Sequence, residues 1–366
     1  TDGRWGEAFA ARFGGDEFVV VCGGLADVAP AEDLATQLVI DMAVPFMLKG
    51  QEFQSGVSIG ISISTEPVPG VHDLMRNADT AMYEAKRAGR RTWVVFDQGM
   101  HDRLARSMQL ETAMRHALSR DEFHLVYQPI VDLETGQLAS VEALLRWRHA
   151  GLGWVEPAEF LPIAEESGHI LAIGEWVINE VCRQWAAWQQ QDAQHAPSSL
   201  SINLSRVQIA LGPQLVTLVH DVLDRYGVPP EALQLEITER DLMKDPAAIR
   251  ELLFALASLG VRLVMDDYGT GTSSLGRLRD YPFHAIKIDR SFVTGMTRDR
   301  QVIAVAHATV NVIENLGMVS IAEGVETRAE VATLQAMGCR FGQGQLFAPP
   351  VPADQLLATV SRCLVS

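Results

Sequence analysis

The sequence predicts an α/β protein whose larger part is a (β/α)8 barrel. From Glu122 onward, strand-like and helix-like stretches alternate along the chain. Eight strand candidates can be recognised, at residues 123–128, 141–147, 200–204, 233–237, 262–266, 285–289, 319–322 and 340–343. Helix-like stretches such as 213–226 and 246–259 separate most of them. This alternation is typical of a parallel sheet, and eight units indicate that the sheet closes into a barrel.

One connection departs from that alternation. Residues 133–138 join the first two strand candidates, and this segment is too short for a helical crossover. Its sequence contains Gly136, which is typical of a hairpin turn. We therefore expect a modified barrel, in which the first strand runs antiparallel to the second.

The first third of the chain has a different pattern. Residues 1–97 contain short strand candidates at 18–22, 57–62 and 93–96 and two helical stretches, which predict a separate α+β domain. Residues 98–120 are charged and helix-prone. Within them, apolar residues recur at helical spacing, which predicts a linker helix with one covered face (Leu104, Met108, Leu110, Met114 and Leu118). The predicted barrel domain is then 121–366.

Composition limits the possible functions. The 366 residues are 48% hydrophobic and carry a formal net charge of −16, which makes a broad binding surface for a DNA or RNA duplex improbable. The cysteines (Cys22, Cys182, Cys339 and Cys363) form no CxxC pair, so we expect reduced thiols and no structural zinc.

Location is also constrained by the sequence. No segment has the length and apolar character needed to cross a bilayer. We expect a cytoplasmic location, either as a free protein or as the cytoplasmic part of a membrane-bound one. The first residue is Thr1 and no signal peptide precedes it, so the chain is expected to begin inside a larger protein.

Polar residues gather at the strand ends, where barrels of this type carry their chemistry. They are Glu142, Asn203, Glu236, Asp266, Asp267, Lys287, Glu323 and Gln343. Carboxylates surrounded by apolar strand residues are costly unless they are paired or bind a metal. An all-oxygen ligand set favours Mg²⁺ or Mn²⁺ over zinc.

These residues suggest phosphoryl chemistry. Asp266 and Asp267 can reach two metals from one turn, and two metals can stabilise the attacking and leaving oxygens of an in-line displacement. Arg146 can bind a phosphate through its guanidinium fork. Lys287 could hold or deprotonate a water ligand of the metal, or simply neutralise an acidic mouth. Asn203 could instead cap a helix that begins near Gln208. From the residues alone, a two-metal phosphodiesterase is the preferred interpretation.

The order of motifs resembles the EAL-domain cyclic di-GMP phosphodiesterases. The motifs are EALLRW, NLS, the Glu236–Glu239 stretch EITE, DDYGTG, KIDRSF, EGVE and QG. Upstream, ARFGGDEF, VSIGIS and ADTAMYEAKRAGR resemble the GGDEF diguanylate cyclase domain. The sequence is thus similar to the C-terminal part of a GGDEF–EAL tandem protein, with a partial GGDEF domain ahead of the barrel.

The resemblance implies hydrolysis of cyclic di-GMP to linear pGpG with two Mg²⁺ or Mn²⁺ ions. The implied metal ligands are Glu142, Asn203, Glu236, Asp266, Asp267 and Glu323. Lys287 would position the nucleophilic water, Gln343 would support the metal-water network, and Glu239 would hold the loop from Asp267 to Ser274. Arg146, Leu144 and Gln128 are expected to contact the substrate. A homodimer is also implied.

Some positions depart from the family pattern. Thr272 and Gln345 replace residues that are often aromatic in the family, which affects the expected loop dynamics and dimer control. The signature residues Gly14, Gly15, Asp16 and Glu17 are intact, so the GGDEF hairpin should form, with GTP as a candidate ligand. Only thirteen residues precede Gly14, which are too few for the whole cyclase site. Trp5 and Ala8 occupy the RxxD positions, so product inhibition there is not expected.

Three alternatives remain open. A non-catalytic receptor for cyclic di-GMP or GTP would use the same binding residues without turnover. A longer parent protein could be a bifunctional cyclase and phosphodiesterase. A carbohydrate-cleaving barrel with paired carboxylates fits poorly, because Asn203, Lys287 and the Asp266–Asp267 pair indicate metals.

Overall fold

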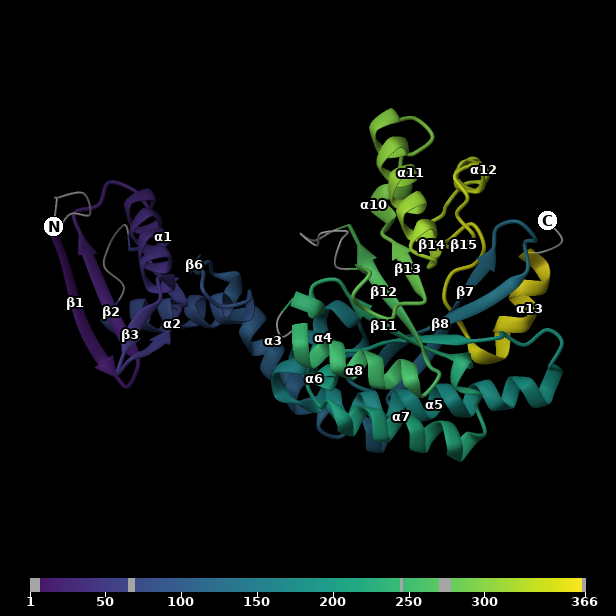
Figure 1. Ribbon diagram of the computed structural model, residues 1–366. Helices are drawn as coiled ribbons and strands as arrows, with labels where there is room; N and C mark the ends of the chain where they lie inside the picture. The colour runs from purple at the N-terminus through teal and green to yellow at the C-terminus, as the bar shows by residue number, and fades with distance from the viewer. Residues whose placement is uncertain (1–6, 65–69, 244–245, 270–277, 364–366) are drawn as a thin grey trace. The chain divides into compact units, whose positions relative to one another are not determined.

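The computed structural model describes residues 7–64, 70–243, 246–269 and 278–363, and it divides into two compact units (Figure 1). Unit 1 spans Thr1–Gln109 and unit 2 spans Leu110–Ser366. Helix α3 (Gly99–Met114) crosses the boundary between them. Within the described residues, no helix is both long and apolar enough to span a membrane.

Unit 1 contains short strand pairs and two helices. An antiparallel hairpin of β1 (Glu7–Gly14) and β2 (Glu17–Gly23) comes first, followed by α1 (Ala29–Ala43). A second hairpin joins β3 (Phe46–Leu48) and β4 (Gln51–Phe53). Helix α2 (Val71–Arg87) then connects the parallel strands β5 (Ile59–Ile61) and β6 (Trp93–Val95). The expected mixed α/β character and the three expected strands are thus present, although β5 is shorter than the stretch expected at 57–62.

The linker segment is helical but its covered face differs from the prediction. Leu110 and Met114 are buried, whereas Met108 is 59% exposed. Residues 108 and 110 are two apart on a helix, so they point about 200° apart and cannot both lie on one narrow face. The expectation that Met108 shares the covered face is therefore wrong.

Unit 2 is a closed barrel in the described residues. Its strand order is β7, β15, β14, β13, β12, β11, β10, β8, and a pairing between β7 and β8 closes the ring. The strands are β7 (Phe123–Asp132), β8 (Leu138–His149), β10 (Leu200–Asn203), β11 (Leu233–Thr238), β12 (Arg262–Tyr268), β13 (Ala285–Ile288), β14 (Val319–Ala322) and β15 (Phe341–Gln343). Strand β7 is antiparallel to both β8 and β15, while the other barrel pairs are parallel. The predicted barrel with one antiparallel strand is confirmed.

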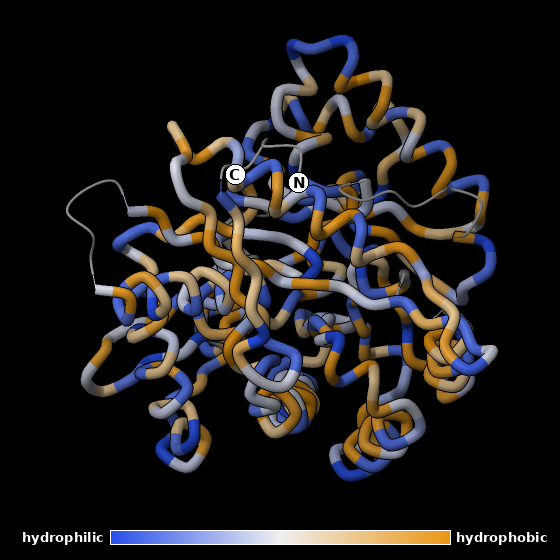
Figure 2. Tube along the Cα trace, turned by 90° about the vertical axis from the view of Figure 1, so that its left-hand side faces the viewer, coloured by the Kyte–Doolittle hydropathy of each residue, from blue (hydrophilic) through white to orange (hydrophobic). Residues whose placement is uncertain are grey.

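Helices follow most barrel strands and cover the outside of the sheet. They are α4 (Pro157–Ser167), α5 (His169–Asp192), α6 (Arg206–Ile209), α7 (Pro213–Tyr226), α8 (Pro246–Ser258), α10 (Arg290–Val293), α11 (Arg300–Asn315), α12 (Arg328–Ala336) and α13 (Ala353–Cys363). In Figure 2 the helices seen nearly end-on carry both hydrophobic and hydrophilic residues around their circumference. This is the expected pattern when one helix face packs on a sheet and the other faces water.

Short elements complete the unit. Strand β9 (Gly153–Val155) pairs with the end of β8, and β16 (Val351–Pro352) pairs with β7. Among the described residues, the 3-10 turns η1 (Leu118–Arg120), η2 (Pro230–Ala232) and η3 (Asp241–Met243) lie between the longer elements. The β7–β8 turn contains Gly136 at φ +71°, in the left-handed region that glycine adopts readily, as expected for a tight hairpin.

Candidate metal centre

The period-two alternation of the strands builds the site. Side chains facing the barrel interior include a small apolar layer of Ile130, Val264, Ala285 and Ile321. Two residues after the last three of these come Asp266, Lys287 and Glu323, which therefore point to the same interior. The intervening residues, such as Met265 and Ile286, are buried in the core on the opposite face of the sheet. One alternating pattern thus produces both the core and the polar layer above it.

Lys287 lies at the centre of the polar layer and is fully buried. Its Nζ is 2.8 Å from Glu142 Oε2, 2.8 Å from Glu236 Oε2 and 3.1 Å from Glu323 Oε1. These partners come from β8, β11 and the residue after β14, so one ammonium group connects three separate parts of the barrel wall. A buried cation of this kind requires such anionic partners.

The environment separates the pKa values of these groups. Burial opposes the charged form of Lys287, but the combined attraction of Glu142, Glu236, Glu323 and Asp266 outweighs it and holds the pKa of Lys287 well above its usual value. Burial also opposes ionisation of Glu142, yet Lys287 and hydrogen bonds from Gln343 and Asn203 keep the pKa of Glu142 below its usual value.

The two remaining partners behave differently. Burial and then the charge of Glu142 raise the pKa of Glu236 well above its usual value. Burial likewise raises the pKa of Glu323 to about 7. Lys287 is therefore matched first by an ionised Glu142, and the other two carboxylates lack full compensation without a further cation.

Amide side chains fix the orientation of Glu142. Asn203 Nδ2 donates to Glu142 Oε1 at 2.7 Å, and Gln343 Nε2 donates to Glu142 Oε2 at 2.7 Å. Gln343 Nε2 also donates to Gln128 Oε1 at 2.9 Å, and Gln128 Nε2 donates to the carbonyl of Ala348 at 3.3 Å. The alternative role of Asn203 as a helix cap is not seen, because Ser205 caps α6.

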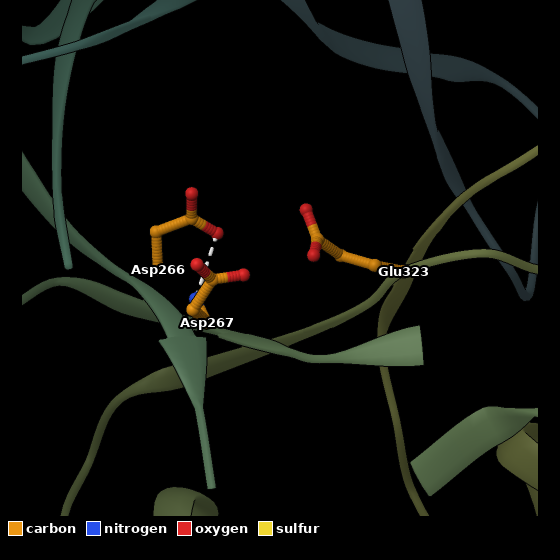
Figure 3. Close-up of side chains that lie close together, drawn as sticks. All are labelled: Asp266, Asp267 and Glu323. Carbon is orange, nitrogen blue, oxygen red and sulfur yellow. Dashed lines mark hydrogen bonds between the residues drawn. The ribbon is translucent and has the colours of Figure 1, made fainter. Parts of the chain in front are cut away.

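Asp266 and Asp267 occupy an irregularity in β12. The register against β13 shifts between Met265 and Tyr268, and Asp267 has φ +54°. Successive residues of a regular strand point to opposite faces, whereas an extra residue in a left-handed conformation turns the chain locally. Figure 3 shows the result, in which both carboxylates lie beside Glu323. The backbone N–H of Asp267 donates to Asp266 Oδ1 at 2.9 Å.

These three carboxylates could hold a divalent cation. One oxygen from each of Asp266, Asp267 and Glu323 lies within 4.8 Å of the others. Burial and the neighbouring charge of Asp266 raise the pKa of Asp267, which reflects unbalanced negative charge. Among the described residues, the buried Glu236 Oε1 and Gln343 Oε1 have no hydrogen-bond partner. Unpaired oxygen acceptors around an acidic group fit Mg²⁺ or Mn²⁺, which prefer oxygen ligands.

Glu239 connects the end of β11 to the segment after β12. Its Oε2 accepts a hydrogen bond from the backbone N–H of Gly269 at 3.2 Å, and its own N–H donates to the Asp266 carbonyl at 3.3 Å. Gly269 has φ +100°, and an added Cβ would lie 2.4 Å from the Phe292 ring. Glu239 therefore contacts the chain at the end of β12, and its family-derived role in holding the loop from Asp267 to Ser274 stays a prediction. Thr272 lies outside the described residues.

The predicted substrate residues lie on one face of the β7–β8 pair. Gln128 is directly opposite Glu142, and Leu144 and Arg146 follow Glu142 on the same face of β8. Arg146 is half-buried, and its Nη1 donates to the Leu145 carbonyl at 2.9 Å. Gln345 is exposed just beyond β15.

The GGDEF signature lies in unit 1 and forms the predicted hairpin. Gly14 ends β1, Glu17 begins β2, and Gly15 has φ +54° in the turn that also contains Asp16. The guanidinium of Arg12 donates to the carbonyl of Gly15 at 2.6 Å and 2.9 Å. All four signature residues are exposed.

Comparison with known families places both units. The EAL domain model matches residues 111–350, and the model of the diguanylate cyclase GGDEF domain matches residues 4–92. Because the first match covers more than half of the chain, the chain belongs to the EAL domain family, with a GGDEF domain ahead of the barrel.

Similar proteins are signalling proteins and phosphodiesterases. The bifunctional diguanylate cyclase/cyclic di-GMP phosphodiesterase MucR of Pseudomonas aeruginosa is 40% identical, over 96% of this chain and 51% of that protein. The oxygen sensor protein DosP of Escherichia coli is 35% identical, over 98% of this chain and 44% of that protein. The chain thus spans about half the length of these relatives.

Solved structures support the barrel. A structure described as the MucR phosphodiesterase in complex with c-di-GMP is 42% identical, with a TM-score of 0.64, covering 68% of this chain and 99% of that one. The EAL domain of FimX from Pseudomonas aeruginosa, bound to c-di-GMP, is 26% identical with a TM-score of 0.61, covering 66% of this chain and 96% of that one.

Two features of the site were not predicted. The β12 irregularity that brings Asp266 and Asp267 to the same side leaves no signal in the residue pattern beyond the adjacent carboxylates. The hydrogen bond from Gln343 to Gln128 joins residues 215 apart in the chain. Only the predicted proximity of the first and last barrel strands could have suggested it.

Proposed function

We propose that the barrel hydrolyses one phosphodiester bond of cyclic di-GMP and releases linear pGpG, using two Mg²⁺ or Mn²⁺ ions. The observation that carries this proposal is the convergence of five carboxylates from four barrel strands on one interior, where Lys287 balances only part of their charge. Family membership and the cyclic di-GMP complexes of similar structures support the same substrate.

Each residue has a role in this proposal. The six oxygen-bearing side chains Glu142, Asn203, Glu236, Asp266, Asp267 and Glu323 would hold the ions. The ions would supply charge stabilisation to the attacking and leaving oxygens of an in-line displacement. Lys287, whose pKa is raised, orients Glu142 and Glu236 and would position the attacking water.

Other groups orient the reacting parts. Gln343 presents its unpaired Oε1 as an acceptor for that water while its Nε2 is held by Gln128 and Glu142. Arg146 can leave its contact with the Leu145 carbonyl and bind a phosphate of the substrate. Glu239 restrains the segment that carries Asp266 and Asp267 through Gly269.

The direct test is a turnover assay with the purified 366-residue chain, cyclic di-GMP and Mg²⁺. We expect pGpG from the unmodified chain and none above background from Glu142→Ala. Glu134→Ala is the matched control, because Glu134 is an exposed carboxylate in the turn that joins β7 to β8, the strand that carries Glu142. No pGpG from the unmodified chain would contradict the proposal.

Metal exchange tests the cofactor separately. Removal of divalent ions with EDTA should stop turnover, and Mg²⁺ or Mn²⁺ should restore it. Ca²⁺ should inhibit, because its larger radius and looser coordination fit a two-metal displacement poorly. Full activity in Ca²⁺, or turnover that persists in EDTA, would exclude this metal role.

For unit 1 we propose regulation by GTP. The intact and exposed turn at Gly14–Glu17 favours this role, and MucR shows that the two domains can occur together in a bifunctional protein. GTP should change the rate of pGpG formation, and Asp16→Ala should remove that response. An unchanged rate across physiological GTP concentrations would rule it out. A homodimer, a cytoplasmic location and cyclase activity in a longer parent remain predictions.

A further inference from the structure

The β7–β8–β9 ribbon continues beyond the ring of barrel strands. Strand β10 pairs with β8 only as far as Ile202 opposite Ala143. Beyond that point β8 pairs with β7 on one side, out to Phe123 opposite Trp147, and with β9 on the other. The ribbon therefore extends from the C-terminal end of the barrel, which is the end that carries the metal centre.

One face of this ribbon is continuous with the interior of the site. Glu142, Leu144, Arg146 and Arg148 alternate on that face of β8, and no register shift interrupts them. His124 lies opposite Arg146, and Trp154 lies opposite Arg148. On the other face, Phe123, Trp147 and Val155 are buried in a hydrophobic cluster. The face that leads away from Glu142 therefore carries cationic and aromatic groups and no carboxylate beyond Glu142 on β8.

His124, Arg148 and Trp154 form an ordered cluster on this face. The guanidinium carbon of Arg148 is 5.8 Å from the centre of the Trp154 ring, and the His124 and Trp154 ring centres are 6.1 Å apart. Trp154 is 58% exposed. Among the tryptophans that the structure describes, it is the one whose side chain is exposed. An exposed indole held by a guanidinium presents a flat, positively charged surface.

Such a surface suits a purine nucleotide. Aromatic and guanidinium groups stack on bases, and cations attract the phosphates. The chain as a whole has a net charge of −16, so an anionic ligand needs locally placed cations of this kind. At about 3.3 Å per residue, Arg146 and the opposing His124 lie about 13 Å along the ribbon from Glu142, on the scale of one nucleotide.

We propose that His124, Arg148 and Trp154 form a subsite for the purine base of the nucleotide that lies farther from the cleaved bond. This inference rests on the proposed substrate of the metal centre. In it, the cleaved phosphodiester lies over the carboxylates, Arg146 meets the second phosphate, and the second base stacks on Trp154. The cluster acts on substrate affinity and leaves the chemical step at the metals unchanged.

The test compares a substrate that has bases with one that lacks them. Trp154→Ala should raise the KM for cyclic di-GMP about tenfold, the size expected for loss of one stacked base, and should leave kcat unchanged. Turnover of bis(p-nitrophenyl) phosphate, which has no purine, should not change. Trp154→Phe should restore most of the affinity, and Arg148→Ala should raise the KM by a smaller factor. A KM equal to that of the unmodified chain, or an equal loss with both substrates, would overturn the inference.

A matched variant controls for loss of an exposed cation–π pair. Arg250 lies 5.6 Å from the Phe254 ring on α8, and Phe254 is 45% exposed. Phe254→Ala should leave both substrates unaffected. Calorimetric binding of cyclic di-GMP in EDTA separates the two proposals. If binding in EDTA depends on Trp154 but the chain shows no turnover when Mg²⁺ is supplied, the proposed hydrolysis alone is refuted. Turnover and binding that are independent of Trp154 would refute the subsite alone, and absence of both binding and turnover would refute both.

Discussion

The barrel mouth holds two groups of carboxylates that differ in what balances their charge. Glu142 and Glu236 are buried on either side of the Lys287 ammonium and each receives a hydrogen bond of 2.8 Å from it. Asp266 and Asp267 lie beside Glu323, and one oxygen from each of these three carboxylates lies within 4.8 Å of the others. Glu323 belongs to both groups, since it also contacts Lys287.

The difference indicates separate functions for the two groups. The first group includes a cation of the chain itself, Lys287, which keeps the pKa of Glu142 low but compensates Glu236 only in part. The second group needs a cation from solution. Substitution of Lys287 should therefore mainly affect folding, and substitution of Asp266 or Asp267 should mainly affect metal binding.

The largest effect is expected for Lys287→Met. This change leaves Glu142, Glu236 and Glu323 buried without their shared cation, and breaking a buried ion pair typically costs about 3–5 kcal/mol. The free energy of unfolding, measured by urea denaturation in EDTA, should fall by about that amount. A loss below about 1 kcal/mol would show that Lys287 does not stabilise the barrel.

Asp267→Asn should reduce turnover and metal binding while leaving stability nearly unchanged. Asparagine tolerates the left-handed conformation of residue 267, and the change removes a charge beside Asp266. Stability in EDTA should change by no more than about 1 kcal/mol, whereas turnover should fall roughly a hundredfold. The stabilisation that Mn²⁺ gives to the unmodified chain should be lost. A strongly destabilised variant that still binds Mn²⁺ would contradict the division between the groups.

The smallest effect is expected for Gln128→Leu, which tests the support that Gln128 gives to Gln343, a hydrogen-bond donor to Glu142. It removes the acceptor for Gln343 Nε2 and the donor to the Ala348 carbonyl, with a cost of about 1–2 kcal/mol in stability. If Gln128 positions Gln343, kcat should fall about tenfold with little change in KM. If it contacts the substrate, KM should rise instead. Gln137→Leu, an exposed glutamine in the neighbouring turn, is the control.

Much of this arrangement follows from the sequence. The alternation of strands and helices predicts the barrel, and the period of two places Lys287 and Glu323 on its interior once the strands are recognised. The short segment 133–138 predicts the antiparallel pair. These features depend on local patterns, which a single sequence displays.

Other features depend on contacts between distant segments. The left-handed Asp267 is set by the mismatch between β12 and β13, and neither strand alone shows it. Strands β9 and β16 are too short to show an alternation of polar and apolar residues, and they form by pairing with β8 and β7. Trp154 lies two residues beyond the turn that follows β8, and only the pairing of β9 with β8 places it opposite Arg148.

The short pairing of β16 with β7 has a practical consequence. The family match ends at residue 350, yet Val351 lies opposite Tyr127, and the indole N–H of Trp188 donates to the Ala353 carbonyl at 3.2 Å. A chain cut back to the family boundary would therefore uncover backbone donors and acceptors along the N-terminal half of β7. Expression of the barrel alone should retain residues 351–363, or self-association through that open edge becomes a hazard.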